Sequence, residues 1–410
     1  MNPSTHRARA LVDALIAQGV KHVVISPGSR NAPIIYALAR AQEAHRLRVH
    51  VRIDERVGAF TALGLSKVQP AAVVTTSGTA AANLYPALLE AYHGRVGLIA
   101  ITADRPHDLR GVGANQTTQQ VGMFTPTIPT VDLPTSTNPT AMINHVTRAA
   151  ATARGVFADP RPVHLNVAFD EPLTPQQPTP GAYEPLDNPG PRLTHHRGAP
   201  RPTLIDVDPP TVVVAGDGSG NEAAEFAQQA NLPLLAEPSS GARSTKVAIP
   251  AYRHVLPDLA PHVAQVIVFG RPTLSREVSH LLAHAPQVRV VATDSEWVDQ
   301  SGNADEILGS PRAEPGPQGW LETWQEAGRN AHASLPQTLA SRVVHHALSP
   351  GQPPTLLGSS MAIRYADLHA PVGEGFTTSP VYASRGLAGI DGTISTASGI
   401  ALATGPLRAI

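Results

Sequence analysis

The sequence of 410 residues contains no cysteine. Disulfides, thiolate zinc sites, iron–sulfur clusters and a cysteine nucleophile are therefore excluded. No apolar run approaches the roughly 20 residues that cross a bilayer. The first residues, "MNPSTHRARALVDALIAQGV", also lack the apolar core and small-residue cleavage site of a signal peptide. We expect a cytoplasmic protein that is not inserted in a membrane.

Net charge is also nearly absent. Lysine and arginine number 31 against 32 aspartate and glutamate residues, which gives a formal charge of −1. This balance gives no support to an extended surface for nucleic acid or an anionic membrane. The length suffices for two or three domains at roughly 100–200 residues each.

Proline, by contrast, is abundant, with 40 residues. Ten of them fall between Thr174 and Pro210, in a segment that resists regular structure and is typical of an extended linker. A second linker is predicted in "NADEILGSPRAEPGPQG". We therefore expect a first domain at 1–173, a proline-rich linker at 174–210, a central domain at 211–335 and a third domain that begins at 336.

Strand-like and helix-like segments alternate on both sides of the proline-rich linker. Before it, Val/Ile-rich strands are predicted in "KHVVISPGSR", "RVHVRID", "AAVVTTSGT", "VGLIAITADRP" and "RPVHLNVAFDEP". After it, strands are predicted in "TVVVAGDGSG", "AQVIVFGRPT", "QVRVVATDS" and "PPTLLGSSMAIR". Continuous apolar strands separated by helices predict an α/β fold with parallel sheets covered by helices on both faces.

Polar turns follow four strands of the first domain: "SPGSR", "DER", "TTSGT" and "TADRP". In parallel sheets, ligands bind at the carboxyl ends of strands, where these turns are expected to gather. Each Ser/Thr turn alone favours helix capping over anion binding. In "TADRPHDLRGVGANQ", Arg105 has a fork that matches a carboxylate, although a surface arginine is usually only solvated.

Glu55, in "RIDERVGAF", has two interpretations. As part of an acidic pair at a helix start it would favour the helix dipole. Its apolar neighbours also suggest partial desolvation, which would raise its pKa and suit a proton-holding role. The glycines of "GDGSGN" (216–221) lack dinucleotide-binding spacing, so tight turns are the better interpretation there.

Together the motifs resemble thiamine-diphosphate-dependent enzymes, and more narrowly the 2-succinyl-5-enolpyruvyl-6-hydroxy-3-cyclohexene-1-carboxylate (SEPHCHC) synthase (MenD) family of menaquinone biosynthesis. The matching stretches come in the family's order: "SPGSRNAP", "RIDERVGAFTALGLSK", "VTTSGTAAANLYPALLEA", "TADRPHDLRGVGANQT", "HLNVAFDEPL" and "SRGLAGIDGTISTASGIALA". The resemblance implies pyrimidine-binding, central and diphosphate-binding domains. It also implies a homodimer or dimer of dimers, with the cofactor between the first domain of one subunit and the third domain of its partner.

The resemblance also implies a reaction and a set of residues. Glu55 would hydrogen-bond the cofactor's pyrimidine ring and promote removal of the thiazolium proton; 2-oxoglutarate would lose CO2, and the remainder would add to isochorismate. The implied substrate-binding residues are Ser29, Arg30, Arg105, Asn115, Gln116, Arg276, Arg364 and Arg385. The implied cofactor-binding residues are Glu55, Ser77, Gln116, Ser360 and Ile390, the last as an apolar prop.

Some positions depart from the family pattern. Ser359 and Ser384 stand where the family usually has asparagine, and Ser275 stands where some relatives have a basic residue. The family's ligands for Mg2+ (or Mn2+) are not found before Ile410, so we expect a C-terminally truncated third domain at 336–410 and little activity from this chain alone. The alternatives are another thiamine-diphosphate lyase, similar to acetolactate synthase, and a non-catalytic remnant that dimerises or binds ligand.

Overall fold

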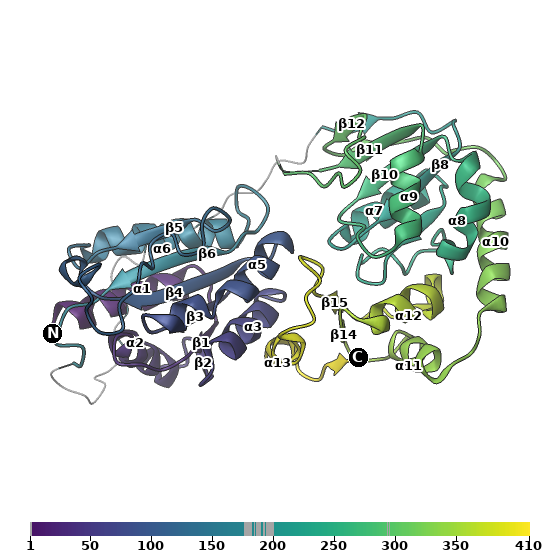
Figure 1. Ribbon diagram of the computed structural model, residues 1–410. Helices are drawn as coiled ribbons and strands as arrows, with labels where there is room; N and C mark the ends of the chain where they lie inside the picture. Colours follow the sequence, from purple (N-terminus) through teal and green to yellow (C-terminus); the bar gives the residue numbers. More distant parts are fainter. Residues whose placement is uncertain are drawn as a thin grey trace. The chain divides into compact units, whose positions relative to one another are not determined.

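The computed structural model describes residues 2–175, 183, 185, 190–191, 193, 201–292, 294 and 296–410. The chain forms two compact units (Figure 1). Unit 1 comprises Met1–Arg197 with Gly386–Gly405, and unit 2 comprises Gly198–Arg385 with Pro406–Ile410. The three predicted domain ranges stay a prediction. Much of the proline-rich linker at 174–210 lies outside the described residues.

Unit 1 is built on a six-stranded parallel sheet. Its strands, in spatial order, are β2 (Arg48–Val51), β1 (His22–Ile25), β3 (Ala71–Thr75), β4 (Leu98–Asp104), β6 (Val163–Ala168) and β5 (Thr130–Leu133). Its helices are α1 (Pro3–Ala17), α2 (Ala32–Glu43), α3 (Glu55–Ser66), α4 (Thr79–Ala82), α5 (Tyr85–His93), α6 (Pro139–Ala153) and α13 (Thr393–Thr404), with a short 3-10 turn η1 (His107–Leu109).

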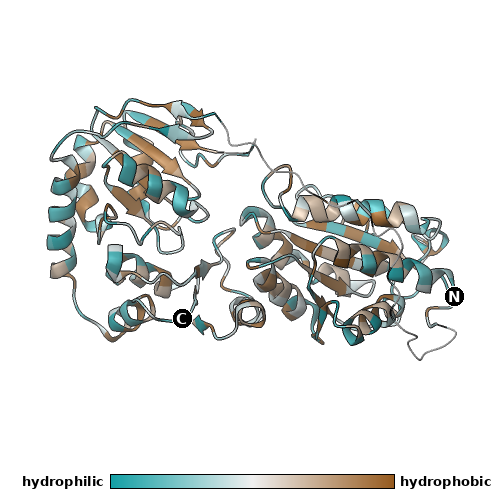
Figure 2. Cartoon of the chain, turned by 180° about the vertical axis from the view of Figure 1, so that it is seen from behind, coloured by the Kyte–Doolittle hydropathy of each residue, from teal (hydrophilic) through white to brown (hydrophobic). Residues whose placement is uncertain are grey.

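Alternate residues of the central strands face two different hydrophobic clusters. In β1, Val23 and Ile25 pack with residues of α1, α2 and α6, whereas Val24 packs with residues of α3 and α5. β3 and β4 follow the same rule, since side chains of a strand point to opposite faces. Both faces are therefore apolar, and much of the strand ribbon in Figure 2 is brown. This confirms the predicted α/β class with a parallel sheet between two helical layers.

Unit 2 contains a five-stranded parallel sheet and a smaller three-stranded parallel sheet. The larger sheet has the order β12 (Glu306–Leu308), β11 (Gln287–Val291), β10 (Gln265–Phe269), β8 (Thr211–Ala215), β9 (Leu234–Ala236). The smaller has the order β15 (Val381–Ala383), β14 (Thr355–Leu357), β16 (Arg408–Ala409), and β7 (Thr203–Leu204) pairs separately with β13 (Pro311–Arg312). The helices are α7 (Gly220–Gln229), α8 (Tyr252–Leu259), α9 (Arg276–His284), α10 (Trp320–Ser334), α11 (Leu339–Ala347) and α12 (Met361–His369), with 3-10 turns η2 (Ala260–His262) and η3 (Gly373–Gly375).

Two local predictions were wrong. The segment "PPTLLGSSMAIR" is a strand only at β14, because Ser360 caps the helix α12 that follows. The predicted second linker contains β12 and β13, each only two or three residues long. The glycines of "GDGSGN" serve turn geometry and packing: Gly218 has a φ of +80°, and a Cβ on Gly216 would lie 2.1 Å from the Arg271 backbone.

Helices α3 and α13 of unit 1 approach each other through glycines. A Cβ on Gly64 would lie 2.0 Å from the carbonyl oxygen of Thr396, and a Cβ on Gly399 would lie 2.0 Å from that of Thr61. Each helix therefore packs backbone against backbone at this crossing. In the described part of the chain, no helix is both long enough and apolar enough to cross a membrane.

Because both clashes are with backbone, Gly64→Ala or Gly399→Ala should separate α3 from α13. We expect each to destabilise unit 1 by about 1–3 kcal/mol, the usual cost of overpacking. Denaturant unfolding, followed by hydrogen exchange in the peptides of α3 and α13, measures this loss. Ser395→Ala, on the same helix, is the control. A Gly399→Ala protein with unchanged exchange in both helices would contradict the packing argument.

Candidate functional site

The four predicted polar turns follow strands that are neighbours in the sheet of unit 1. In the parallel register, Ile25 at the end of β1 pairs with Val51 of β2 and with Val74 of β3, and Thr75 pairs with Thr102 of β4. The carboxyl ends of these strands therefore meet at one edge of the sheet, as predicted. This edge carries Ser29, Arg30, Glu55, Ser77 and Arg105.

The two acidic residues at the start of α3, Asp54 and Glu55, differ in their contacts. Asp54 is the N-cap, and its Oδ1 accepts a hydrogen bond of 2.8 Å from the backbone N–H of Val57. Glu55 is the first helical residue and is half-buried. Within the described residues, its carboxylate has no hydrogen-bond or ion-pair partner. Since Asp54 satisfies the helix start, the Glu55 carboxylate remains available to a ligand.

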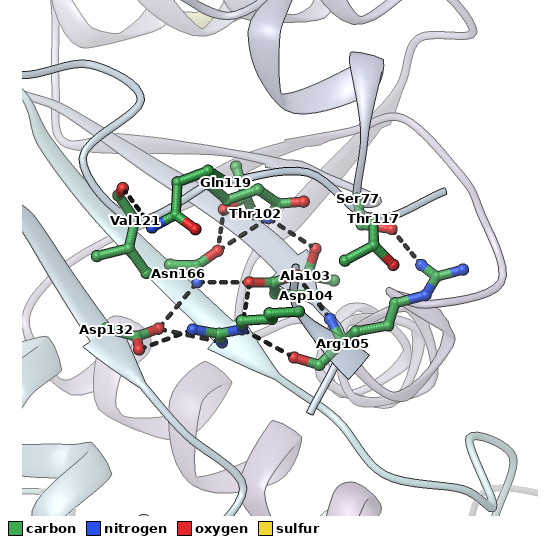
Figure 3. A network of polar contacts seen from close by, with 12 residues as sticks. Ser77, Thr102, Ala103, Asp104, Arg105, Thr117, Gln119, Val121, Asp132 and Asn166 are labelled. Carbon is green, nitrogen blue, oxygen red and sulfur yellow. Dashed lines mark hydrogen bonds and ion pairs between the residues drawn. The ribbon is translucent and has the colours of Figure 1, made fainter. Parts of the chain in front are cut away.

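Arg105, Ser77 and Gln116 form a connected polar group. The Nη1 of Arg105 donates to the Oγ of Ser77, a contact that Figure 3 shows. The Oγ of Ser77 donates to the carbonyl oxygen of Gln116 at 3.0 Å, and Gln116 Nε2 donates to the carbonyl oxygen of Ser77 at 3.1 Å. Gly78, with a φ of +82°, leaves room for Gln116, because a Cβ there would lie 3.1 Å from Gln116 Cγ.

Two guanidinium groups lie close together at this edge. Arg105 is only 9% exposed, and the Arg30 side chain is 11% exposed. Burial, and then the charge of Arg30, lower the pKa of Arg105. Arg30 donates to the carbonyl oxygen of Phe169 at 2.9 Å and lies 3.5 Å from the carboxylate of Glu171. A pair of partly desolvated, mutually repelling cations favours an anionic ligand with carboxylate geometry.

A buried polar network behind this edge was not predicted from the sequence. Gln120 accepts from the backbone N–H of Gly78 at 3.0 Å and donates to Asn166 Oδ1 at 2.8 Å. Asn166 donates in turn to Asp104 and Asp132, both at 2.9 Å, as Figure 3 shows. The network fixes the turn that carries Ser77 to strands β4 and β6. Its one signal in the sequence was the polar residues inside otherwise apolar strands.

The other predicted residues of these turns are at the surface. Ser29 and Asn115 are exposed and adjacent in sequence to Arg30 and Gln116. Ile390 is 76% exposed and lines a surface pocket of about 230 Å³ together with Arg56, Phe60 and residues of α13. Arg56, next to Glu55, forms an ion pair of 3.0 Å with Asp391, next to Ile390. Unit 1 thus brings the chain neighbours of Glu55 and Ile390 into contact.

The turn that carries Ile390 is held by Glu90, which sequence reasoning missed. Glu90 lies on α5 and is 5% exposed. Its two carboxylate oxygens accept hydrogen bonds of 2.7 Å from the backbone N–H groups of Gly386 and Leu387. A Cβ on Gly386 would lie 2.3 Å from the Glu90 carbonyl oxygen, so only glycine permits this approach. Gly392, further along the turn, packs against the Phe60 ring in the same way.

In unit 2, Arg385 contacts the segment that leads to Arg276. Arg385 is 6% exposed and donates to Thr273 Oγ1 at 2.8 Å. Arg276 follows Thr273 by three residues. It is exposed at the first position of α9, whose N-cap is Ser275. Glu237, another residue not predicted, is 2% exposed and accepts from the backbone N–H of Leu274 at 2.8 Å.

The remaining predicted residues of unit 2 lie at the start of α12. Ser360 is the N-cap and accepts from the backbone N–H of Ala362 at 3.3 Å, and Arg364 is exposed one turn further. Ser359 donates to the carbonyl oxygen of Ser384 at 2.8 Å. The two serines that depart from the family pattern therefore contact each other.

Comparison with known proteins identifies the family. Residues 5–123 match the thiamine pyrophosphate enzyme, N-terminal TPP binding domain family. The chain is 44% identical to the SEPHCHC synthase of Kineococcus radiotolerans, over 100% of this chain and 78% of that protein. The SEPHCHC synthases of Renibacterium salmoninarum (42%; 98% of this chain, 74% of that protein) and an Arthrobacter species (44%; 96% and 69%) are similar.

The chain belongs to the SEPHCHC synthase family. The TPP binding match covers the turns that carry Arg30, Glu55, Ser77, Arg105 and Gln116. The residue roles themselves rest on motif matching and stay predictions.

For this member of the SEPHCHC synthase family, Glu90→Gln is expected to loosen the turn that carries Ile390. An amide has one acceptor oxygen, so one of the two backbone N–H groups would lose its partner, at a cost of about 1–3 kcal/mol. Hydrogen exchange in the peptide containing Gly386 and Leu387 should become faster, while exchange in β1 stays unchanged. Glu43→Gln, which alters an exposed carboxylate, is the control. Equal protection in both variants would contradict the role given to Glu90.

Glu237 predicts a pH dependence for unit 2. Burial raises the pKa of this carboxyl to about 8. The unfolded chain releases the proton at lower pH than the folded chain does, so the free energy of unfolding falls as the pH rises from about 5 to about 8. Glu237→Gln removes the ionisable group and with it this pH dependence of the free energy of unfolding. The stability of the variant relative to wild type should therefore increase over that interval, measured by denaturant unfolding; a pH-independent difference would exclude the shift.

A surface substitution controls for general charge effects in the same titration. Glu322→Gln removes an exposed carboxylate of α10, also in unit 2. Its stability relative to wild type, measured at the same pH values, is the baseline against which the change in Glu237→Gln is compared.

Proposed function

We propose that this chain has the residues for the thiamine-diphosphate-dependent decarboxylation of 2-oxoglutarate and the conjugate addition of the resulting succinyl fragment to isochorismate, with little turnover by this chain alone. The products are SEPHCHC and CO2, in menaquinone biosynthesis. The observation that carries the proposal is the buried pair Arg30 and Arg105 at the same sheet edge as the unpartnered Glu55 carboxylate. Both substrates carry carboxylates, which arginine can bind. The reaction also needs a carboxyl group that exchanges a proton with the cofactor.

The residues of unit 1 fit the pyrimidine part of thiamine diphosphate. Glu55 is a half-buried carboxylate with no partner among the described residues, and Ile390 offers an exposed apolar side chain beside a pocket. Glu55 would hold a proton against a ring nitrogen. In the proposed dimer, Ile390 would support the cofactor that Glu55 of the partner subunit contacts. When bound, thiamine diphosphate supplies the carbon nucleophile and accepts the electron pair that CO2 leaves behind.

Fewer residues of the described chain are proposed to bind the diphosphate part of the cofactor. Ser360, at the N-terminus of α12, is proposed to lie near the diphosphate, since helix N-termini attract anions. The described residues contain no group of three or more His, Cys, Asp or Glu side chains that could hold a metal ion. These residues therefore do not by themselves fit a site for Mg2+ or Mn2+.

Substrate recognition follows from charge and shape. Arg30 and Arg105 would bind a carboxylate of isochorismate, with Ser29, Asn115 and Gln116 as polar neighbours. Their guanidinium groups would orient the ring rather than take part in proton transfer, because arginine does not release its proton in proteins. Arg276, Arg364 and Arg385 are proposed as further carboxylate-binding residues.

The proposal also covers assembly and location. A homodimer or a dimer of dimers in the cytoplasm is proposed, as the family resemblance implies. Size-exclusion chromatography with light scattering measures the assembly directly.

Glu55→Gln tests the function. Thiamine-diphosphate-dependent release of CO2 from 2-oxoglutarate is measured with isochorismate, Mg2+ and, supplied in trans, the part of a relative that this chain does not cover. It should fall by about 10²–10⁴-fold, the usual contribution of a positioned proton-transfer group. Isochorismate binding, measured by calorimetry, should be unchanged. Arg105→Lys, which keeps the charge but loses the fork, should instead weaken isochorismate binding.

Three outcomes would oppose the proposal. Equal turnover by Glu55→Gln and the control Glu43→Gln would remove the role of Glu55. Acetolactate formation from pyruvate, with no use of isochorismate, would favour another thiamine-diphosphate lyase. Isochorismate binding without cofactor-dependent CO2 release, even when the part of a relative that this chain does not cover is supplied in trans, would favour a non-catalytic protein.

A further inference from the structure

A second polar pocket, in unit 2, is lined mainly by histidines. It has a volume of about 310 Å³. His332 of α10, His345 and His346 of α11 and His369 of α12 line it, together with Arg342. The lining contains no carboxylate, and its other side chains are Gln and Ser. Every titratable group in its wall is therefore neutral or cationic.

Several polar groups of this wall already have partners, including one ring nitrogen, because His345 Nδ1 donates to the carbonyl oxygen of His369 at 3.2 Å. Ser341 Oγ donates to the carbonyl oxygen of Thr338 at 2.8 Å, and Ser349 Oγ donates to that of His345 at 2.7 Å. His369 is 5% exposed, and within the described residues its Nδ1 has no hydrogen-bond partner. A buried, unpartnered ring nitrogen in a pocket is costly unless a ligand or water meets it.

Two ligand classes suit clustered imidazoles: transition metals and anions. In the described chain, no three of these side chains converge in an arrangement that could hold a metal ion. An anion needs no such convergence, since it accepts charge-assisted hydrogen bonds from separate donors. Arg342 supplies a permanent positive charge, and protonated imidazoles supply further donors at lower pH.

We propose that this histidine pocket binds a small oxyanion, a phosphate or a carboxylate, and binds it more tightly as the pH falls below 7. The imidazoles of His332 of α10, His345 of α11 and His254 of α8 act on the charge of His369. The ring of Tyr365, also on α12, lies 5.9 Å from the His369 ring, centroid to centroid. Burial, and then these three imidazoles, lower the pKa of His369. An anion among them would offset the repulsion between protonated rings, so binding is coupled to proton uptake.

Calorimetry with inorganic phosphate at pH 5.5 and pH 7.5, at constant ionic strength set with chloride, tests the proposal. We expect affinity to rise by about tenfold or more at the lower pH, as charge-assisted hydrogen bonds are gained. Repeating the titration in two buffers of different ionisation enthalpy should reveal proton uptake on binding. Acetate replaces phosphate in a parallel series, and the tighter binder identifies the anion class.

The variants are chosen at exposed positions so that the fold is retained. Arg342→Gln and His345→Gln should each weaken phosphate binding by about tenfold at pH 5.5. His262→Gln, at an exposed histidine of η2 in the same unit, should leave it unchanged. Binding that is equal in all three variants, absence of proton uptake, or uptake of Zn2+ with no anion binding would each overturn the proposal.

Discussion

The backbone contact between α3 and α13 is the constraint on which the arrangement in unit 1 depends. α3 starts at Glu55, and α13 starts three residues after Ile390. Because glycines 64 and 399 let the two helices touch without side chains between them, the starts of both helices are fixed relative to each other. The half-exposed ion pair between Arg56 and Asp391 contributes little stability by itself, as is usual for surface pairs, but it reports the same alignment.

The chemistry of the sheet edge follows from a division between charges that serve the fold and charges that remain for a ligand. Asp54 caps a helix, and Asp104 and Asp132 pair with Arg110 at 3.1 and 2.9 Å. By contrast, Glu55 has no partner among the described residues, and Arg105 points its guanidinium at a serine. A buried network of this kind holds side chains in place before a ligand arrives.

The sequence allowed the α/β class and the shared edge of four turns to be predicted, because long apolar strands such as β4 have a clear pattern. The short strands β12 and β13 were taken for a linker, since two or three residues carry no periodicity. β5 and α6 were not predicted, although Asn138 and Pro139 form a recognisable helix start. The hydrogen-bond partners of Glu90, the backbone N–H groups of Gly386 and Leu387, lie 296 and 297 residues away in the chain. Local sequence patterns do not predict contacts at such separations.

The two bonds of Glu90 have a thermodynamic consequence. Ordering a loop costs roughly 1–2 kcal/mol of backbone entropy per residue. In this chain the residues that lead to Ile390 are ordered when unit 1 folds, so this entropy is lost before any ligand is present. A ligand that packs on Ile390 then keeps more of its contact energy as affinity, and its on-rate is not limited by a search of the loop through other conformations.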